Sequence, residues 1–271
     1  MTDITFGTTT ASSSSLALGY NHACSILDNG SVKCWGVYTH GRLGNFATQN
    51  IGDGPGEMGD ALVVTNLGTG RTATSISAGL HSASPHTCAV LDDGTVKCWG
   101  FNNTGQLGIG NTTTMGDTAE RMGDNLSAVD LGTGRTAVDV SVGNGFSCAL
   151  LDNGSVKCWG RNAYGQLGIG NTTTMGDAAD EMGDNLSAVD LGTGRTAVAI
   201  ATGYDHVCAI LDNGQVKCWG ANTHGRLGIG STTTIGDAAS EMGDNLAYTS
   251  LGTGLTPVQI DAGNGHTCAL F

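Results

Sequence analysis

The chain has 271 residues, of which 24 are Asp or Glu and 11 are Lys or Arg, so its formal net charge is −13. Binding to nucleic acid or to an anionic membrane surface requires a basic footprint, which this composition excludes. Glycine is unusually common at 45 residues, and without a collagen period it indicates many tight turns between short strands. No apolar run reaches the length of a membrane span, so we expect neither nucleic-acid binding nor membrane insertion.

The first fifteen residues are polar and rich in Ser and Thr. They have neither the basic start nor the apolar centre of a secretory signal. Ile4–Gly7 is a short strand candidate within this stretch. We assign residues 1–15 to an N-terminal segment and residues 16–271 to a single domain.

From Leu16 onward the chain repeats itself with a period of sixty residues. A segment Ala-Gly-x-x-His-Thr-Cys-Ala-x-Leu, in its fullest form, occurs five times, and four extra residues, Leu80–Ala83, lengthen its first interval to sixty-four. Such internal repetition decides the fold class before any other feature. A second segment, Gly-Ser-Val-Lys-Cys-Trp-Gly or a close variant, follows the first four copies at Gly30–Gly36, Gly94–Gly100, Gly154–Gly160 and Gly214–Gly220.

Each unit contains short strand candidates separated by Gly, Asn and Asp. In the third unit they are Ala137–Val142, Ser147–Leu151 and Ser155–Trp159, with Ala128–Leu131 as a weaker fourth. No stretch shows helical periodicity over three turns. Strands of this length at even spacing predict an all-β fold, a β-propeller with one blade per repeat of about sixty residues. A solenoid is the alternative, but four short strands per unit fit a blade better.

The string from Cys148 to Gly170, C-A-L-L-D-N-G-S-V-K-C-W-G-R-N-A-Y-G-Q-L-G-I-G, resembles the regulator-of-chromosome-condensation (RCC-type) repeat. The resemblance covers nearly all residues from Leu16 onward. It implies a β-propeller with four-stranded blades whose loop faces grip another protein. Family members include a nucleotide-exchange factor, a bacterial inhibitor protein and many uncharacterised surface proteins, so the fold narrows the function only weakly.

The chain departs from that family in the length and number of its repeats. A loop of the type Gly170–Ala197 replaces a shorter connection, and there are four complete units plus a half unit where the family usually has seven blades. In one arrangement the half unit Val258–Phe271 meets Ile4–Gly7 and closes a five-bladed ring. In the other, the chain is a piece of a larger ring or assembles with neighbours. We favour closure, because a free strand edge is a site of assembly or aggregation.

Eight of the nine cysteines form four pairs with nine residues between the partners. If the intervening turn is a three-residue loop with Gly30 in the left-handed conformation, Ile26 lies opposite Val32 and Cys24 opposite Cys34, within reach of a disulfide. Reduced buried cysteines and a metal site are the alternative interpretations. Disulfides in every blade would indicate a protein that works outside a reducing cytosol. The candidate pairs are Cys24/Cys34, Cys88/Cys98, Cys148/Cys158 and Cys208/Cys218.

Cys268 has no downstream partner, because the chain stops at Phe271. We interpret it as a free thiol, an intermolecular link or a sign of truncation.

The long loops carry a recurring acidic pattern, Gly-Asp-x3-Glu-Met-Gly-Asp. Carboxylates in a Gly-rich loop are candidate calcium ligands, although the spacing is not that of an EF-hand. Solvated turns fixed by Asp side chains are the commoner outcome, and a protein-binding face along one rim is a third interpretation. In the second unit Arg121 replaces the Glu, while Asp117 and Asp124 remain. The candidate calcium ligands are Asp53, Glu57, Asp60, Asp177, Glu181, Asp184, Asp237, Glu241 and Asp244.

Histidines precede the first cysteine of most units, but Phe146 takes that place in the third. A catalytic or metal-binding role would not survive this replacement, so we predict structural rings hydrogen-bonded to a turn. The recurring tryptophans are predicted to pack between blades. No phosphate loop, nucleophile elbow or zinc-protease motif is present, so we predict a non-enzyme with no small-molecule substrate. The residues concerned are His22, His86, His206 and His266, and Trp35, Trp99, Trp159 and Trp219.

Three functions follow from these patterns. The first is a protein-interaction or structural module, possibly self-assembling, displayed outside the cell or on a cell or virion surface. The second is an intracellular regulator that binds a nucleotide-binding protein, as the exchange-factor branch of the family does. The third is an enzyme acting at the propeller axis. We favour the first, with calcium as the one cofactor that the acidic loops would suit.

Overall fold

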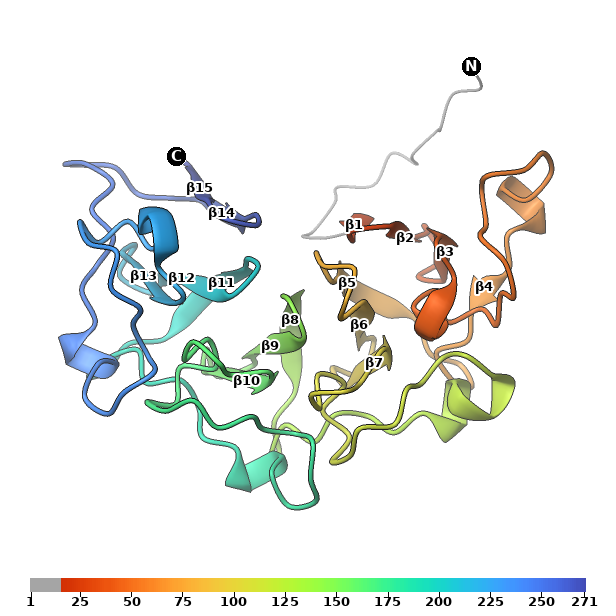
Figure 1. Cartoon of the computed structure of the whole chain (residues 1–271), viewed down its shortest axis with the longest axis horizontal. Helices are drawn as coiled ribbons and strands as arrows, with labels where there is room; N and C mark the ends of the chain where they lie inside the picture. The colour runs from red at the N-terminus through yellow and green to blue at the C-terminus, as the bar shows by residue number, and fades with distance from the viewer. Residues whose placement is uncertain (1–15) are drawn as a thin grey trace.

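Short antiparallel strands dominate the structure, a computed structural model in which residues 16–271 are described. The strands form five small sheets arranged side by side in an open arc (Figure 1). The all-β propeller architecture is therefore as predicted. The strand candidate Ile4–Gly7 lies outside the described residues, and within them no hydrogen-bonded sheet joins the two ends of the arc.

The sheets follow one another along the chain as successive blades. The first comprises β1 (Leu16–Leu18), β2 (His22–Ile26), β3 (Val32–Gly36) and β4 (Val64–Thr65); the second β5 (Ala73–Ala78), β6 (His86–Leu91) and β7 (Val96–Gly100); the third β8 (Ala137–Val142), β9 (Phe146–Leu151) and β10 (Val156–Gly160); the fourth β11 (Ala197–Thr202), β12 (His206–Leu211) and β13 (Val216–Gly220); and the last β14 (Gln259–Ala262) and β15 (Thr267–Leu270). Short 3-10 helices interrupt the outer loops at η1 (Thr39–Gly41), η2 (Gly59–Ala61), η3 (Ala119–Arg121), η4 (Gly123–Asn125), η5 (Gly183–Asn185), η6 (Thr223–Gly225) and η7 (Gly243–Asn245).

A fourth, outermost segment belongs to each complete blade. In the second blade the Val129 amide donates to the Val96 carbonyl at 2.8 Å, and Val189 does the same to Val156 in the third. Ala128–Leu131 was predicted as a strand of the third unit. It instead closes the second blade, because the chain returns along β7 before it crosses to the next sheet.

The hairpin between the second and third strands has the predicted register. Ile26 pairs with Val32, Cys24 faces Cys34, and the Leu27 amide donates to the Ser31 carbonyl at 2.8 Å. Gly30 has φ +76°, a conformation that residues with a Cβ rarely adopt. The turn therefore fixes which side chains face each other along both strands.

The core lies between neighbouring blades. Trp99, Trp159 and Trp219 have no solvent exposure, and the indole of each donates to a loop carbonyl of the preceding blade. The acceptors are Arg42 at 3.0 Å, Gln106 at 3.0 Å and Gln166 at 3.1 Å. These three tryptophans pack between blades as predicted, whereas Trp35, in the first blade of the arc, is only half-buried.

Buried histidines link three of the blade pairs. His22 Nε2 lies 2.9 Å from Thr87 Oγ1, His86 Nε2 lies 2.9 Å from Ser147 Oγ, and the same contact recurs between the fourth and fifth blades. The sequence predicted a hydrogen bond between each histidine ring and a turn. The observed partner of Nε2 is instead a hydroxyl on the next blade, and only His86 also contacts a turn, at the Ser84 carbonyl.

Among residues 16–271, the structure contains no helix long and apolar enough to cross a membrane.

Candidate protein-binding face

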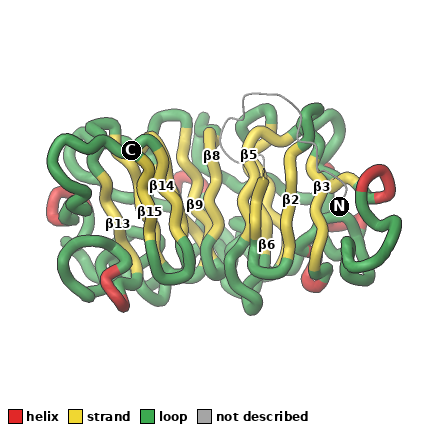
Figure 2. Tube along the Cα trace, turned by 90° about the horizontal axis from the view of Figure 1, so that it is seen from above, coloured by secondary structure: helices red, strands yellow, loops and turns green. Residues whose placement is uncertain are grey.

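The strands run between two layers of loops, which lie above and below the sheets in Figure 2. One layer, which we call the turn face, holds the hairpin turns between the second and third strands. The opposite layer, which we call the variable face, holds the connections between the first and second strands together with the segments that follow the third strands. These two kinds of segment are hydrogen-bonded to each other, as where the Ala221 amide donates to the Asp205 carbonyl at 2.8 Å. The variable face comprises residues 19–21, 79–85, 143–145, 203–205, 263–265, 37–40, 101–104, 161–164 and 221–224.

The turn face repeats one Arg–Asp arrangement at three of its four hairpin turns. Arg135 lies 3.4 Å from Asp152, and Arg195 lies 3.4 Å from Asp212, each pair about one-third exposed. An equivalent pair joins Arg71 to Asp92 at 3.5 Å. Exposed ion pairs of this kind contribute little free energy, and their repetition indicates a structural role in the turns.

The variable face carries aromatic side chains at positions that are aromatic in some repeats and not in others. The ring centroid of His81 lies 4.8 Å from that of Tyr204 in an edge-on contact and 6.3 Å from that of Tyr20. His81 belongs to Leu80–Ala83, the four residues that lengthen the first interval. Tyr20 is 58% exposed. One inserted loop thus brings side chains of the first, second and fourth blades into a single aromatic cluster.

A charged pair beside this cluster is also unique to one pair of blades. Arg161 Nη1 forms a close ion pair with Asp205, which is buried and accepts from Asn144 Nδ2 at 3.3 Å. Burial raises the pKa of Asp205, while the charge of Arg161 opposes that shift. The guanidinium of Arg161 also lies 5.4 Å from the centre of the Tyr164 ring. Aromatic and Arg side chains are the types that contribute most at protein interfaces.

A second aromatic contact lies farther along the same face. The rings of His40 and Phe101 are 4.6 Å apart, and they join the loops that follow β3 and β7. The variable face therefore presents Tyr, Phe, His and Arg side chains from several blades, each at a position where the repeats differ.

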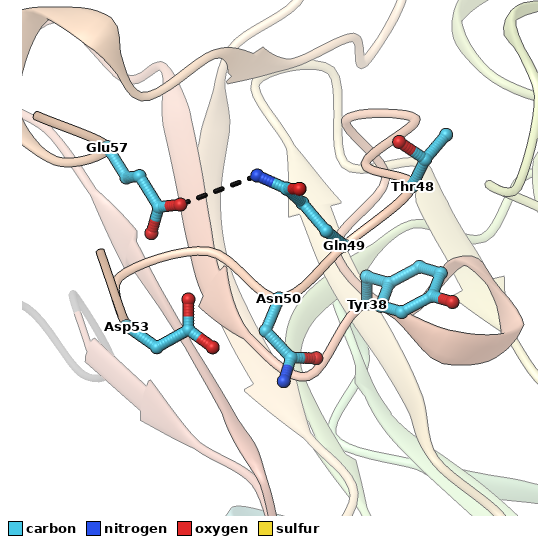
Figure 3. A pocket seen from close by; sticks show the side chains of 6 residues that line it. All are labelled: Tyr38, Thr48, Gln49, Asn50, Asp53 and Glu57. Carbon is cyan, nitrogen blue, oxygen red and sulfur yellow. Dashed lines mark hydrogen bonds between the residues drawn. The ribbon is translucent and has the colours of Figure 1, made fainter. Parts of the chain in front are cut away.

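The acidic loop of the first repeat is shown in Figure 3. Glu57 and Asp53 line an open pocket together with Tyr38, Gln49 and Asn50. Glu57 Oε2 accepts from the amide of Gly52 at 2.7 Å and from that of Gly54 at 2.9 Å. These hydrogen bonds hold the pKa of Glu57 below its usual value. The carboxylate of Glu57 thus closes its own loop.

The later loops use their carboxylates in the same way. Glu181 Oε2 accepts from the amides of Gly176 and Ala178, each at 2.9 Å. Asp184 instead reaches a different segment, where Thr133 donates from its amide at 2.9 Å and from its hydroxyl at 2.6 Å. The same pair of contacts joins Asp244 to Thr193. Asp60 is exposed.

Within one loop the Glu and the last Asp have different partners, because the Glu accepts from its own loop and the last Asp from a threonine of another segment. Asp177 and Asp237 lie beside Glu181 and Glu241, and burial together with the neighbouring charge raises the pKa of each Asp. The calcium site stays a prediction. In the described part of the chain, no group of three His, Cys, Asp or Glu side chains is positioned to hold a metal ion. In the second repeat, Arg121 lies 2.9 Å from Asp117.

The cysteines lie where the hairpin register puts them. The structure pairs Cys24 with Cys34, Cys88 with Cys98, Cys148 with Cys158 and Cys208 with Cys218, with Cα atoms 4.0–4.1 Å apart. The remaining one, Cys268 on β15, is exposed and unpaired within residues 16–271.

The sequence profile of the "Regulator of chromosome condensation (RCC1) repeat" matches four stretches, residues 14–42, 85–106, 137–166 and 197–226. These four stretches of the chain are RCC1 repeats. The matches cover the second and third strands of the four complete blades, the same hairpins that position the cysteine pairs.

The chain is similar in sequence to two much longer proteins. Over 218 residues it is 29% identical to the human E3 ubiquitin-protein ligase HERC2, which covers 80% of this chain and 4% of HERC2. It is 27% identical to the ultraviolet-B receptor UVR8 of Arabidopsis thaliana, covering 80% of this chain and 43% of UVR8. The chain thus spans less than half the length of either relative.

Two solved structures share the fold. Human WBSCR16 superposes with a TM-score of 0.68 at 20% identity, covering 94% of this chain and 56% of WBSCR16. Prp20p of Saccharomyces cerevisiae gives a TM-score of 0.67 at 17% identity, covering 94% of this chain and 54% of Prp20p. The RCC1-repeat arc therefore matches slightly more than half of each of these propellers.

The variable face was not among the sites predicted from the sequence. A signal for it was present, because Leu80–Ala83, Arg161 and Asp205 each break the sixty-residue pattern. Periodicity drew attention to residues present in every repeat, whereas Tyr20 and Tyr204 recur in two repeats only and His81, Arg161 and Asp205 in one.

Proposed function

We propose that this RCC1-repeat chain is a non-enzymatic protein-binding module and that the variable face is its binding surface. The observation that carries this proposal is the aromatic cluster of Tyr20, His81 and Tyr204 beside Arg161. Side chains gathered from separate blades onto one face are suited to a single partner, whereas the turn face offers one Arg–Asp arrangement at three of its four hairpin turns. Prp20p, which has the same fold, is described by its binding to Gsp1p and histones.

The test compares two triple variants of matched size. Tyr20→Ala/His81→Ala/Tyr204→Ala removes the aromatic cluster, and Arg71→Ala/Arg135→Ala/Arg195→Ala removes the repeated ion pairs of the turn face. A partner is first isolated with the wild-type chain, and its dissociation constant is then measured with purified proteins. We expect at least about tenfold weaker binding for the first variant, since hot-spot truncations cost about 2 kcal/mol or more, and little change for the second. Equal weakening by both variants would refute the assignment of the face.

We further propose that the module works in an oxidising setting, outside the cell or on a cell or virion surface. Four cysteine pairs at bonding distance, one per complete blade, support this proposal, because disulfides persist in oxidising compartments.

The compartment proposal is tested by the intact mass of protein from its native source, alkylated under denaturing conditions without reductant. We expect a single alkylated thiol, at Cys268. Nine alkylated thiols would contradict the proposal and would favour the alternative, an intracellular regulator of a nucleotide-binding protein.

A further inference from the structure

The first repeat departs from the others at one residue of the segment that follows its third strand. The later repeats have an asparagine there, without solvent exposure. In the second repeat Asn102 Nδ2 donates to the carbonyls of Asn111 at 2.7 Å and Thr113 at 3.0 Å, and Asn102 Oδ1 accepts from the Leu107 amide at 3.0 Å. Asn162 makes the same three contacts in the third repeat. The asparagine therefore holds the loop that follows it against its own blade.

Tyr38 takes the place of that asparagine in the first repeat. Its ring packs against the apolar core between the first and second blades. A phenol has one donor and cannot replace both carbonyl contacts of the amide. A pocket of about 470 Å³ lies beside the ring, within the range of about 300–1,000 Å³ that is usual for small-molecule sites. The residues that line it are Tyr38, Thr48, Gln49, Asn50, Asp53 and Glu57.

The opening of this pocket does not come from the place of the first repeat in the arc. The second repeat has a complete blade on both sides, and there the equivalents of Thr48, Gln49 and Asp53 are exposed as well. All six lining residues belong to one repeat, so the wall of the pocket is built without a neighbouring blade. The exposed equivalents in the second repeat are Thr112, Thr113 and Asp117.

The wall of the pocket offers both hydrogen-bond donors and acceptors. Figure 3 shows the two carboxylates on one side and Tyr38, Thr48 and Asn50 on the other, with Gln49 reaching across to Glu57. Gln49 Nε2 lies 3.5 Å from Glu57 Oε1. Among residues 16–271, the side chains of Tyr38, Thr48 and Asn50 have no hydrogen-bond partner. Two hydroxyls and one amide are thus available to a ligand.

The charge and the hydrogen-bonding groups of the wall fit a neutral ligand with several hydroxyls. Asp53 and Glu57 are the charged residues of the lining, so they repel an anionic ligand. Amide and hydroxyl groups both donate and accept, as a sugar hydroxyl does, whereas a metal ion or an ammonium group would leave the donors of the wall unused. The ring of Tyr38 adds an apolar surface that suits the C–H face of a sugar ring.

We propose that this pocket binds a neutral saccharide. Asp53 accepts hydrogen bonds from the sugar hydroxyls, the amide of Asn50 donates and accepts, and the ring of Tyr38 packs against the sugar ring. The pocket is open and encloses one side of the ligand, so a single site binds weakly, with a dissociation constant on the order of 1 mM. The aromatic cluster of the variable face contributes none of these groups, so the proposal does not depend on the partner-binding role of that cluster.

The first experiment is saturation-transfer NMR on the full chain, with the methyl glycosides of glucose, galactose, mannose and N-acetylglucosamine as probes. Glucuronic acid and putrescine serve as the anionic and cationic comparisons. We expect transfer to at least one neutral glycoside and none to glucuronic acid. Transfer to no neutral glycoside at millimolar concentration, or tighter binding of putrescine than of every glycoside, would overturn the proposal.

The second experiment locates the bound glycoside with a matched pair of variants. Tyr38→Asn/Gln49→Thr/Asn50→Thr gives the first repeat the residues of the second, which the fold already accommodates there. Thr112→Ala/Thr172→Ala removes exposed hydroxyls from the same loop of two other repeats. We expect the dissociation constant to rise at least about fivefold in the first variant, because the ring and the amide contacts are lost, and to stay unchanged in the second. Wild-type affinity in the first variant, or equal weakening in both, would assign the binding to another surface and refute the site.

Discussion

At the scale of single residues, the histidines between blades are ionisable groups that the fold keeps neutral. Burial lowers the pKa of His22 to about 3 and that of His86 to about 4. The pKa of His206 is about 4 for the same reason, with Arg226 adding to the shift. A neutral ring can share one proton with the hydroxyl of the next blade. Between the third and fourth blades Phe146 and Val207, both fully buried in one cluster, take the places of the ring and the hydroxyl.

These pKa values predict that the chain loses stability on mild acidification. Between pH 6.5 and 4 the unfolded histidines bind protons that the folded ones do not, so the free energy of unfolding falls as the pH falls. Each buried histidine contributes a slope of up to about 1.4 kcal/mol per pH unit in this window. Urea unfolding at several pH values from 6.5 to 5 measures the total slope.

The natural Phe146–Val207 pair supplies the control for that prediction. We expect His86→Phe/Ser147→Val to fold and to have a smaller slope, reduced by up to about 1.4 kcal/mol per pH unit. A slope equal to that of the wild-type chain would show that His86 is not proton-linked to folding.

At the scale of elements, the hairpin was predictable from the sequence and the fourth strand was not. An Asp-Asn-Gly turn taken as a three-residue loop places Cys24 opposite Cys34, whereas a two-residue turn at Asn29-Gly30 would shift the register by one; the structure has the first register. Ala128–Leu131 was recognised as a strand candidate but attached to the wrong blade. Its partner, Val96, is more than thirty residues earlier in the chain. No residue pattern in the intervening loop indicates that the chain comes back to pair with β7.

A loop contact between blades gives a prediction at this scale. Gly165 has φ +68°, and a Cβ there would lie 2.2 Å from the backbone amide nitrogen of Asp237 in the next long loop. Gly194 has nearly the same conformation, φ +67°, but a Cβ there would meet nothing within 4 Å. Both changes to alanine incur backbone strain of about 1–2 kcal/mol.

We expect Gly165→Ala to lose about 1–3 kcal/mol more than Gly194→Ala, because only the former forces two loops apart. Chemical denaturation of the two variants measures the difference. Equal losses would mean that the loops move aside freely and do not join the blades.

At the scale of the whole molecule, the sheets of the arc form a linear array in which each packs against its neighbours, and the variable face adds a contact between the second and fourth blades. The stability of such an array is a sum over units and the interfaces between them. Within residues 16–271, the third blade has a complete blade on both sides, whereas β14–β15 has one on one side only. The repeat count predicted this succession of blades. It could not predict the variable face, since Tyr20, His81 and Tyr204 come together only once the blades curve around a common axis.

Hydrogen exchange should follow the position of each blade in the array. We expect the amides of β9 to exchange most slowly and those of β15 to exchange fastest among the blade strands, because opening begins where a sheet lacks neighbours. Uniform protection from β2 to β15 would contradict this and would indicate a closed ring with no ends.

The apolar pair between the third and fourth blades also bears on how repeats of nearly identical sequence find their proper neighbours. If the third repeat docked directly against the last sheet, Phe146 would meet the hydroxyl of Thr267, and if the second docked against the fourth, His86 would meet Val207 and find no acceptor. Either mismatch leaves a buried polar group unsatisfied, at a cost of about 1–3 kcal/mol. The interface between the third and fourth blades is therefore specific for its own two partners. It disfavours arrangements in which a blade is skipped or swapped during folding, even though neighbouring repeats have nearly the same sequence.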